Sequence, residues 1–262
     1  FTQDLDMWQP TSVTDMSGMF ANTALFNGNI TTWDVTSVLD FGAMFQNALV
    51  FNQPIGNWAS TGTTENVNDM SYMFSNAVAF DQPLNAWNVS GVTNMTNLFS
   101  GTTLFNQDIS SWDVSSVTSM QSMFNGADAF NQDLSAWGSR LGAVNINMAN
   151  MFLSASAFNQ SLGAWDISLV TNMGGMLSFS NLSTANYDAT LIGWATLDAV
   201  AGETAIPANL TLSAAGLNYC VSETERTFLD VTQNWTISDA GVDCTAAFIV
   251  TNTNDAGEGS LR

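Results

Sequence analysis

The chain has 262 residues, of which 46% are hydrophobic, so it is long and apolar enough to bury a large core rather than remain disordered. Its 23 acidic residues against three basic ones give a net charge of -20, which repels phosphate backbones and anionic lipid surfaces. The chain has no His, and no apolar run approaches the ~20 residues of a membrane helix. Nucleic-acid binding, direct membrane insertion, His-based zinc sites and a Ser-His-Asp triad are therefore not expected.

A repeat of about 25 residues fills residues 1–182 in seven copies, and the same residue types recur at fixed places in each copy. Phe opens each copy, Trp follows seven residues later, and a Met-x-x-Met pair or its Leu or Phe equivalents closes the pattern. One copy cannot bury its own apolar residues, so the copies are expected to stack with like side chains on each other. The predicted repeat core comprises Phe26, Trp33, Phe51, Trp58, Phe80, Trp87, Phe105, Trp112, Met120, Met123, Phe130, Trp137, Phe158 and Trp165.

Each copy is predicted to hold one strand and one helix. The segment from the Phe to just past the Trp is bordered by Ser, Thr, Asn and Asp, which is typical of a short strand between turns. In 117–124 the apolar residues Val117, Met120, Met123 and Phe124 fall on one face of two helical turns. The predicted fold is therefore an α/β repeat solenoid of seven coils, with one short strand and one short helix per coil.

Two copies are longer than the others, and both carry their extra residues between the Trp and the first Met, at 59–69 and 138–147. Insertions confined to one point of a repeat map to one loop on one face. These two loops are the predicted contact sites of the solenoid. Their candidate contact residues are Thr61, Thr64, Glu65, Asn66, Ser139, Arg140 and Asn145.

The spacing of the repeat is lost from Ser183 onward, and residues 183–245 are predicted to form a mixed α/β cap over the last coil. Within this cap, 187–197 is predicted to be a helix that places Leu191 and Trp194 on one face. The two cysteines of the chain, Cys220 and Cys244, either form one disulfide in an oxidising compartment or remain buried thiols, and the pattern favours the disulfide. Residues 246–262 are predicted to be a linker or the start of a following domain.

The repeat resembles a known family. Residues 105–124, FNQDISSWDVSSVTSMQSMF, are similar to a repeat of about 25 residues in bacterial surface proteins that is related to the BspA-like class of leucine-rich repeats. The resemblance implies a leucine-rich-repeat-like solenoid on a large secreted or cell-surface protein, with a role in adhesion and without catalytic residues. Residues 248–262, FIVTNTNDAGEGSLR, are similar to the lead-in of parallel β-helix domains in such proteins, which implies that a β-helix-like domain follows.

Paired carboxylates are the remaining candidates for chemistry, as in glycosidases, and Asp108, Asp113, Asp133 and Asp166 are the obvious ones. They stand at repeated places, whereas a catalytic pair should be singular, so we predict no enzyme and no catalytic or cofactor-binding residue. Calcium could bind clustered carboxylates and carbonyls, but the sequence has no calcium-loop motif. The favoured interpretation is that Asp and Asn cap turns.

The predicted function is that of a non-enzymatic structural or adhesive module of a large secreted or cell-surface bacterial protein. Its expected partners are host, matrix or neighbouring-cell surface proteins or glycans. Two alternatives stay open: a carbohydrate-binding module, or a filament subunit that self-associates end to end through an uncapped first coil. Because the chain begins at Phe1 inside the repeat pattern, it is expected to be a mature or excised piece of a longer protein.

Overall fold

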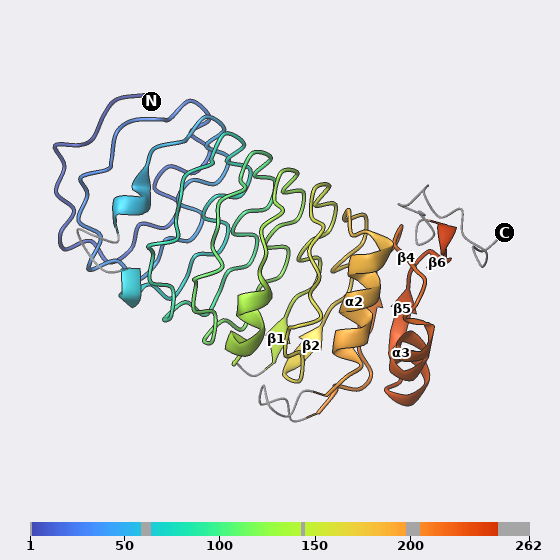
Figure 1. The fold of residues 1–262 in the computed structure, drawn as a ribbon. Helices are drawn as coiled ribbons and strands as arrows, with labels where there is room; N and C mark the ends of the chain where they lie inside the picture. Colours follow the sequence, from blue (N-terminus) through green and yellow to red (C-terminus); the bar gives the residue numbers. More distant parts are fainter. Residues whose placement is uncertain (1, 59–63, 143–144, 198–204, 246–262) are drawn as a thin grey trace, which may run out of the picture.

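The computed structural model describes residues 2–58, 64–142, 145–197 and 205–245. Consecutive repeats run parallel and lie on one another, so that the chain forms one elongated stack (Figure 1). Single parallel backbone bridges join equivalent residues of neighbouring repeats, in a row that runs through Asp15, Asp40, Asp69, Asn94, Ser119 and Asn147. Each repeat is therefore one coil of the stack, and its neighbours supply the partners for its backbone.

The predicted α/β solenoid, with a strand and a helix in each of seven coils, is wrong. Turns and irregular segments make up most of each coil, and the helices and strands that the structure places in the repeats are few and short. They are the 3-10 helices η1 (Ile55–Asn57), η2 (Thr64–Asn66) and η3 (Ser135–Arg140), and the parallel strand pair β1 (Ile146–Asn147) and β2 (Val170–Asn172). In place of the predicted helix over 117–124, the first four residues are irregular with a bridge at Ser119, and the last four are turns.

Left-handed residues explain why the predicted helix does not form. Ser122 has a φ of 56°, which cannot belong to a right-handed helix. The Met123 N–H donates to Met120 O at 3.1 Å and closes a turn, whereas the Ser122 N–H donates to Ala149 O of the next coil at 2.8 Å. N–H groups thus alternate between turns within a coil and bonds to the next coil. The residues equivalent to Ser122 also have positive φ: Gly18, Ala43, Tyr72, Asn97, Asn150 and Gly175.

The core of the stack consists of columns of like side chains. The Phe26 and Phe51 rings lie 5.9 Å apart and nearly parallel, and the Trp33 and Trp58 rings lie 6.4 Å apart in the same way. The residues predicted for the repeat core are all at most 3% exposed. Stacking therefore removes from water the aromatic surface that a single coil would leave exposed.

Polar side chains also connect one coil to the next. The Trp33 indole N–H donates to Leu5 O of the preceding coil at 2.9 Å, and the other buried tryptophans of the repeats make the equivalent bond. The side-chain oxygen of Asn27 accepts the backbone N–H of Asn52 at 2.9 Å and the amide of Gln53 at 3.2 Å. Within the described ranges, every buried side-chain nitrogen and oxygen has a partner.

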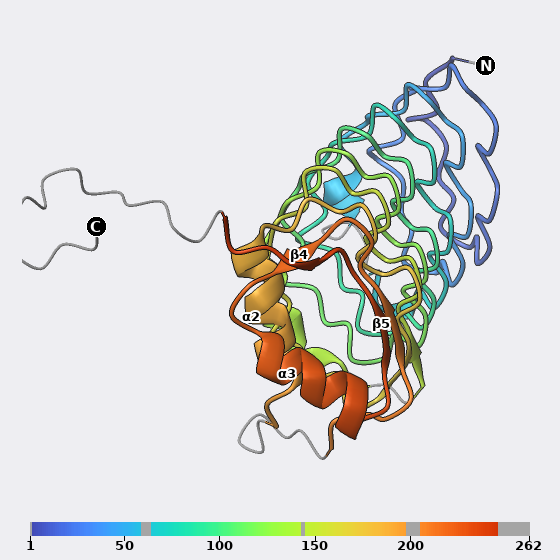
Figure 2. The same ribbon diagram turned by 90° about the vertical axis from the view of Figure 1, so that its right-hand side faces the viewer.

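The C-terminal region adds longer elements to the end of the stack (Figure 2). They are α2 (Thr184–Trp194), β3 (Thr211–Ser213), β4 (Asn218–Tyr219), α3 (Glu223–Thr227) continued by the π-helical turn η4 (Phe228–Thr232), β5 (Thr236–Ser238) and β6 (Gly241–Val242). β3 pairs with β5 and β4 with β6, both in parallel, and a bridge from Met173 to Leu212 joins them to the last repeat. None of the described helices is long and apolar enough to cross a membrane.

The hydrogen-bond pattern of the repeat continues past Ser183, where the sequence spacing is lost. Trp194 of α2 donates its indole N–H to Leu162 O at 3.0 Å, as each repeat tryptophan does to the coil before it. The Asn186 amide donates to Asn159 O at 2.7 Å, in the place of the repeat glutamine. Leu191 precedes Trp194 by three residues, just as Leu162 precedes Trp165. α2 is therefore part of a further, modified coil.

Candidate contact surfaces

The first predicted contact loop is partly tied to the stack. Thr64 is buried, and its hydroxyl donates to Asn88 O at 2.9 Å. The Asn66 side chain donates to Thr36 O at 2.9 Å but remains exposed, as does Glu65. Thr61 lies outside the described residues. Glu65 and Asn66 are thus the described members of this loop that a partner can reach.

The second predicted contact loop is anchored by its arginine. Arg140 ends η3, and its guanidinium donates to Ser110 O at 3.1 Å and to Trp112 O at 2.9 Å in the preceding coil. Ser139 and Asn145 are exposed, and Asn145 has a left-handed φ of 61°. Arg140 therefore acts as a clamp between coils, while Ser139 and Asn145 stay accessible.

A row of exposed aliphatic side chains was not predicted. Its members, which we call the aliphatic row, stand one or two places before the repeat Phe: Leu25, Leu49, Val50, Val78 and Leu104, with 67, 44, 41, 37 and 55% of their surfaces exposed. Backbone contacts keep neighbouring coils in register here, because Ala79 N–H donates to Leu49 O at 3.1 Å. The row ends at the fifth coil, where small or polar residues take these places. The signal in the sequence was an apolar residue directly before the Phe.

The carboxylates considered for catalysis cap turns. Asp108 accepts the Ser110 N–H at 2.9 Å, and this bond lowers the pKa of the Asp108 carboxyl. Asp113 is likewise bonded to Ser115, whose hydroxyl and N–H lower the pKa of Asp113. Asp133 and Asp166 accept the N–H two residues ahead, at 2.8 and 2.9 Å. Each carboxylate thus accepts hydrogen bonds within its own turn.

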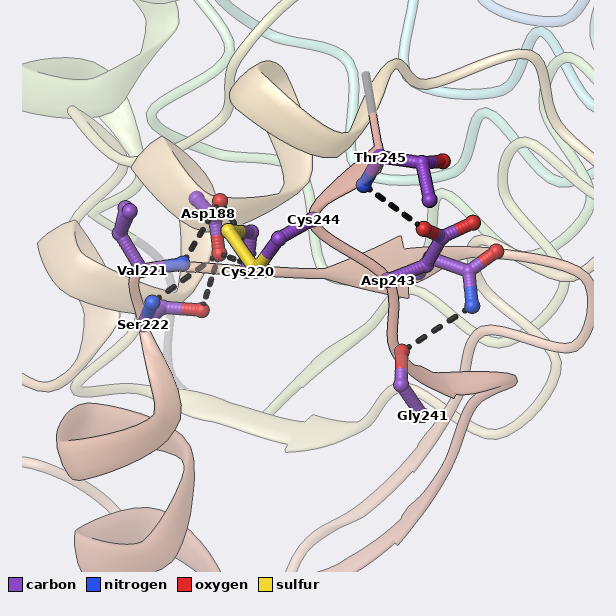
Figure 3. The surroundings of a disulfide bond; sticks show 9 residues. Asp188, Cys220, Val221, Ser222, Gly241, Asp243, Cys244 and Thr245 are labelled. Carbon is purple, nitrogen blue, oxygen red and sulfur yellow. Dashed lines mark hydrogen bonds between the residues drawn. A yellow bond between two sulfur atoms is a disulfide. The ribbon is translucent and has the colours of Figure 1, made fainter. Parts of the chain in front are cut away.

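The disulfide is confirmed, and it joins neighbouring coils. Cys220 follows β4 and Cys244 follows β6, and their Cα atoms are 4.9 Å apart (Figure 3). Beside it, the buried carboxylate of Asp188 in α2 accepts the N–H groups of Cys220, Val221 and Ser222 and the Ser222 hydroxyl. Ser222 is the N-cap residue of α3, so Asp188 also supplies negative charge where that helix begins.

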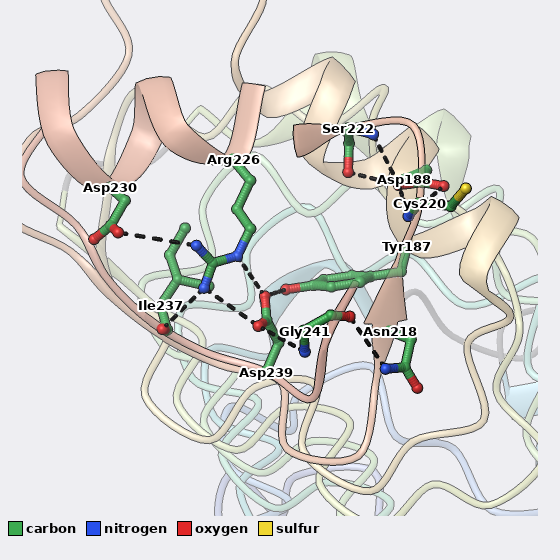
Figure 4. Close-up of polar contacts among 10 residues, drawn as sticks. All are labelled: Tyr187, Asp188, Asn218, Cys220, Ser222, Arg226, Asp230, Ile237, Asp239 and Gly241. Atoms are coloured by element: carbon green, nitrogen blue, oxygen red, sulfur yellow. Dashed lines mark hydrogen bonds and ion pairs between the residues drawn. The ribbon is translucent and has the colours of Figure 1, made fainter. Parts of the chain in front are cut away.

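A second polar cluster joins α2, α3 and the last strands (Figure 4). Arg226 of α3 donates from Nε to Asp239 at 2.8 Å, and this bond raises the pKa of the guanidinium. Tyr187 of α2 donates its hydroxyl to the same carboxylate at 3.1 Å, and burial raises the pKa of that phenol well above its usual range. The guanidinium carbon also lies 5.2 Å from the centre of the Tyr219 ring. The cluster has a structural role, because its buried charges are fully paired.

A hollow of about 400 Å³ lies outside α2, between residues 183–192 and Val221. Among the described residues, Asp188 is the only ionisable one that lines it, and its carboxylate accepts backbone N–H groups at the start of α3. In the described part of the chain, no three His, Cys, Asp or Glu residues are grouped so that they could hold a metal ion. The described lining of the hollow is mainly apolar, with Ala185, Ala189, Ile192 and Val221.

The comparison with known proteins matches the repeat region of the chain. A family model described as "Mycoplasma protein of unknown function, DUF285" matches residues 1–90, 60–142 and 82–194 in three overlapping regions. The chain belongs to this family. The DUF285 matches reach into α2, in agreement with the hydrogen bonds that extend the repeat to Trp194. The search of curated proteins gave no match for this DUF285 chain. No solved structure matches it either.

Proposed function

We propose that the chain is a non-enzymatic adhesive or structural module of a large secreted or cell-surface bacterial protein. The supporting observation is that the aromatic, amide and cationic side chains that could bind a ligand are engaged in contacts within the stack. The aromatic rings stack in the core, the Asn and Gln amides bond to neighbouring coils, and the described cations Arg140 and Arg226 are bound to the scaffold. What remains for function is the outer surface of the stack. The sequence resemblance to BspA-like repeats supports a secreted or cell-surface location, and a relationship to those repeats is part of this proposal.

The aliphatic row is the surface that best suits a protein partner. Exposed apolar residues that gather at adjacent positions are uncommon on monomeric proteins and mark interaction sites. The row runs along the first four coils, and asparagines at the equivalent of Asn22 flank it, with Asn47 donating to Asn22 at 2.8 Å and Asn76 to Asn47 at 3.0 Å. An apolar strip edged by amides offers burial together with hydrogen bonds at its rim. We therefore assign adhesion to a protein surface on a host, in a matrix or on a neighbouring cell.

Binding of the purified chain to immobilised matrix proteins, to host cells and to a glycan array tests this function. The variant Leu25→Ser, Leu49→Ser, Val78→Ser and Leu104→Ser should lose binding to the protein target at least tenfold. A matched control replaces exposed aliphatic residues of the C-terminal region instead, with Val221→Ser, Val231→Ser and Val242→Ser, and should bind as the unchanged chain does.

Equal binding by both variants would exclude the aliphatic row as the adhesive surface. Binding to glycans that survives loss of the row would favour the carbohydrate-binding alternative. Binding that is lost only when Glu65, Asn66, Ser139 and Asn145 are replaced would move the contact to the two predicted loops. Circular dichroism of every variant shows whether the stack is intact.

A further inference from the structure

Phe179 is an exposed aromatic residue in the seventh repeat. It has 64% of its surface exposed, more than any other described aromatic residue. An equivalent residue stands three places after the closing Met or Leu of each earlier repeat; these residues are Asn22, Asn47, Asn76, Gly101, Gly126 and Ser154. Small or amide side chains thus occupy this position in six repeats, and a bulky ring occupies it in the seventh.

The backbone conformation of Phe179 makes this ring unfavourable for stability. Its φ is 58°, and its six equivalents also have positive φ, between 56° and 69°. The stack imposes this conformation, because the Phe179 N–H donates to Ala215 O at 2.8 Å just as the Ser154 N–H donates to Ser178 O at 2.9 Å. Gly and Asn adopt left-handed backbone readily, whereas a bulky side chain does so under strain. Strained residues cluster at functional sites, so the Phe179 ring is a candidate contact group.

The hollow beside α2 is a cavity of matching chemistry. Its volume is about 400 Å³, and its apolar lining consists of Ala185, Ala189, Ile192 and Val221. Ile192 and Val221 have 37 and 69% of their surfaces exposed, so apolar groups here are open to solvent. A cavity of about 150 Å³ is enough to hold a benzene ring. The hollow can therefore accept a phenyl ring, and Phe179 of the same chain is not among the residues that line it.

The ring and the hollow lie on the same part of the surface. Ser183 lines the hollow and follows Phe179 by four residues, which span at most about 14 Å. A Cβ atom on Gly216 would lie 3.7 Å from Phe179 Cδ1, and Val221 of the lining follows Gly216 by five residues. Phe179 and the lining of the hollow, which we call the Phe179 patch, thus combine a projection with a cavity.

The Phe179 patch is uncharged in a strongly acidic chain. Residues 167–187, 189–197 and 205–222 hold the ring and all of the described lining except Asp188, and they contain no Asp, Glu, Lys or Arg. Asp188 is buried, and its carboxylate accepts three backbone N–H groups at the start of α3 (Figure 3). The net charge of -20 makes copies of the chain repel each other, and this patch adds least to that repulsion.

We propose that the chain forms a two-fold dimer through the Phe179 patch, in which Phe179 of each copy occupies the hollow of the other. A patch that carries both a projection and a cavity is self-complementary, as a two-fold contact requires. The contact removes the ring and the apolar lining from water together, and aromatic anchors that fill pockets dominate the energy of such interfaces. The aliphatic row lies in the first four coils and stays free, so the inference does not depend on the proposed adhesive function.

Sedimentation equilibrium of the purified chain and its variants tests the dimer. Phe179→Asn removes the ring and introduces the residue found at Asn22 and its next two equivalents. Ala185→Gln with Ala189→Gln fills the hollow from exposed positions of α2, with residues that favour a helix. A mixture of these two variants restores one of the two contacts, because each chain supplies the half that the other lacks.

Tyr72→Asn is the matched control. Tyr72 is also an exposed aromatic residue with left-handed backbone, with a φ of 57° and 40% of its surface exposed, but it lies in the third repeat. Both substitutions to Asn should raise the melting temperature of the monomer by a few degrees, because each relieves strain. Only Phe179→Asn should weaken the dimer.

The unchanged chain should dimerise, and Phe179→Asn or the filled hollow should each raise the dissociation constant at least about tenfold. The mixture should dimerise more tightly than either variant alone and less tightly than the unchanged chain. Because both copies are acidic and the contact is apolar, the dimer should tighten as the salt concentration is raised. Circular dichroism shows whether each variant keeps the stack.

The proposal is overturned if the unchanged chain stays monomeric at millimolar concentration, or if it forms a dimer that Phe179→Asn does not weaken. It is also overturned if the mixture dimerises no better than its two components, because the ring then does not enter the hollow. A monomeric chain that loses binding to an immobilised protein on Phe179→Asn would assign the ring to a different partner and would likewise overturn the dimer.

Discussion

Removal of the disulfide should release the last coil and leave the others intact. Cys220 and Cys244 are 24 residues apart, and in the loop-entropy relation a closed loop of that length stabilises the folded state by about 3.5 kcal/mol. The last coil is otherwise held by short parallel pairs, such as the Ala214 N–H to Ser238 O at 2.8 Å, and by the bonds that Asp239 accepts from Arg226 and Tyr187. The stabilisation from these few contacts is comparable to that from the disulfide. Loss of the disulfide should therefore make this coil the first to unfold.

The disulfide can be removed in two ways, by substitution and by reduction, and both should have the same effect on stability. Cys220→Ser with Cys244→Ser, and reduction of the unchanged chain by dithiothreitol, should each lower the free energy of unfolding of the last coil by about 3.5 kcal/mol. Hydrogen exchange followed by mass spectrometry should show faster exchange in 218–243 and unchanged exchange in the second to sixth coils. The double variant is the control for dithiothreitol itself, which should not affect it. A loss below about 1 kcal/mol, or one spread evenly over the stack, would refute the reasoning.

Three other predictions concern single side chains. Trp112→Ala deletes a buried ring and should lower the free energy of unfolding in urea by about 3–5 kcal/mol. Trp8→Ala, in the same column but exposed, should lower it by less than about 1 kcal/mol. Equal losses for the two variants would contradict the burial of the Trp column. Arg226→Met leaves the buried carboxylate of Asp239 unpaired and should cost about 3–5 kcal/mol in the same assay, while Asp230→Asn, whose carboxylate is 3.9 Å from the guanidinium and nearly half exposed, should stay within about 0.5 kcal/mol. Because Ser115 lowers the pKa of Asp113, this residue contributes stability that is present above the unfolded pKa near 3.9 and lost as pH falls through the lower folded value. Asp113→Asn should keep the turn, as Asn88 does with Ser90, and should lessen the fall in melting temperature below about pH 4; an unchanged acid profile would argue against this role.

The residue columns could be predicted from the sequence, but the backbone between them could not. Trp112 and Phe105 recur at a fixed period, and burial against the next copy is the simplest use of such a repeat. The helix over 117–124 was wrong because spacings of three and four residues also arise from successive turns. Met120 and Met123 point to the same side since a turn closes between them, with Ser122 in the left-handed region. A serine carries no signal for that conformation, although Gly18 and Asn97 at the same place do.

For the candidate contact surfaces, too, the sequence predicted some features and missed others. Arg140 was expected to project to a partner, yet the carbonyls of Ser110 and Trp112 bind its guanidinium, and hydrogen bonds between coils cannot be read from one sequence. The modified coil around Trp194 was missed because α2 replaces the usual turns and alters the spacing. The hydrogen bond from its indole to Leu162 O shows the equivalence only once the fold is known.

The direction of the hydrogen bonds between coils determines how the molecule responds to force. These bonds run along the stack, so tension applied between its two ends loads them one row at a time rather than together. Coils should then peel away singly, and each release should lengthen the tether by roughly 85 Å for 25 residues of extended chain. The disulfide between Cys220 and Cys244 prevents the segment between them from extending under tension. A stack built in this way should therefore lengthen coil by coil under tension, while the coil closed by the disulfide resists extension.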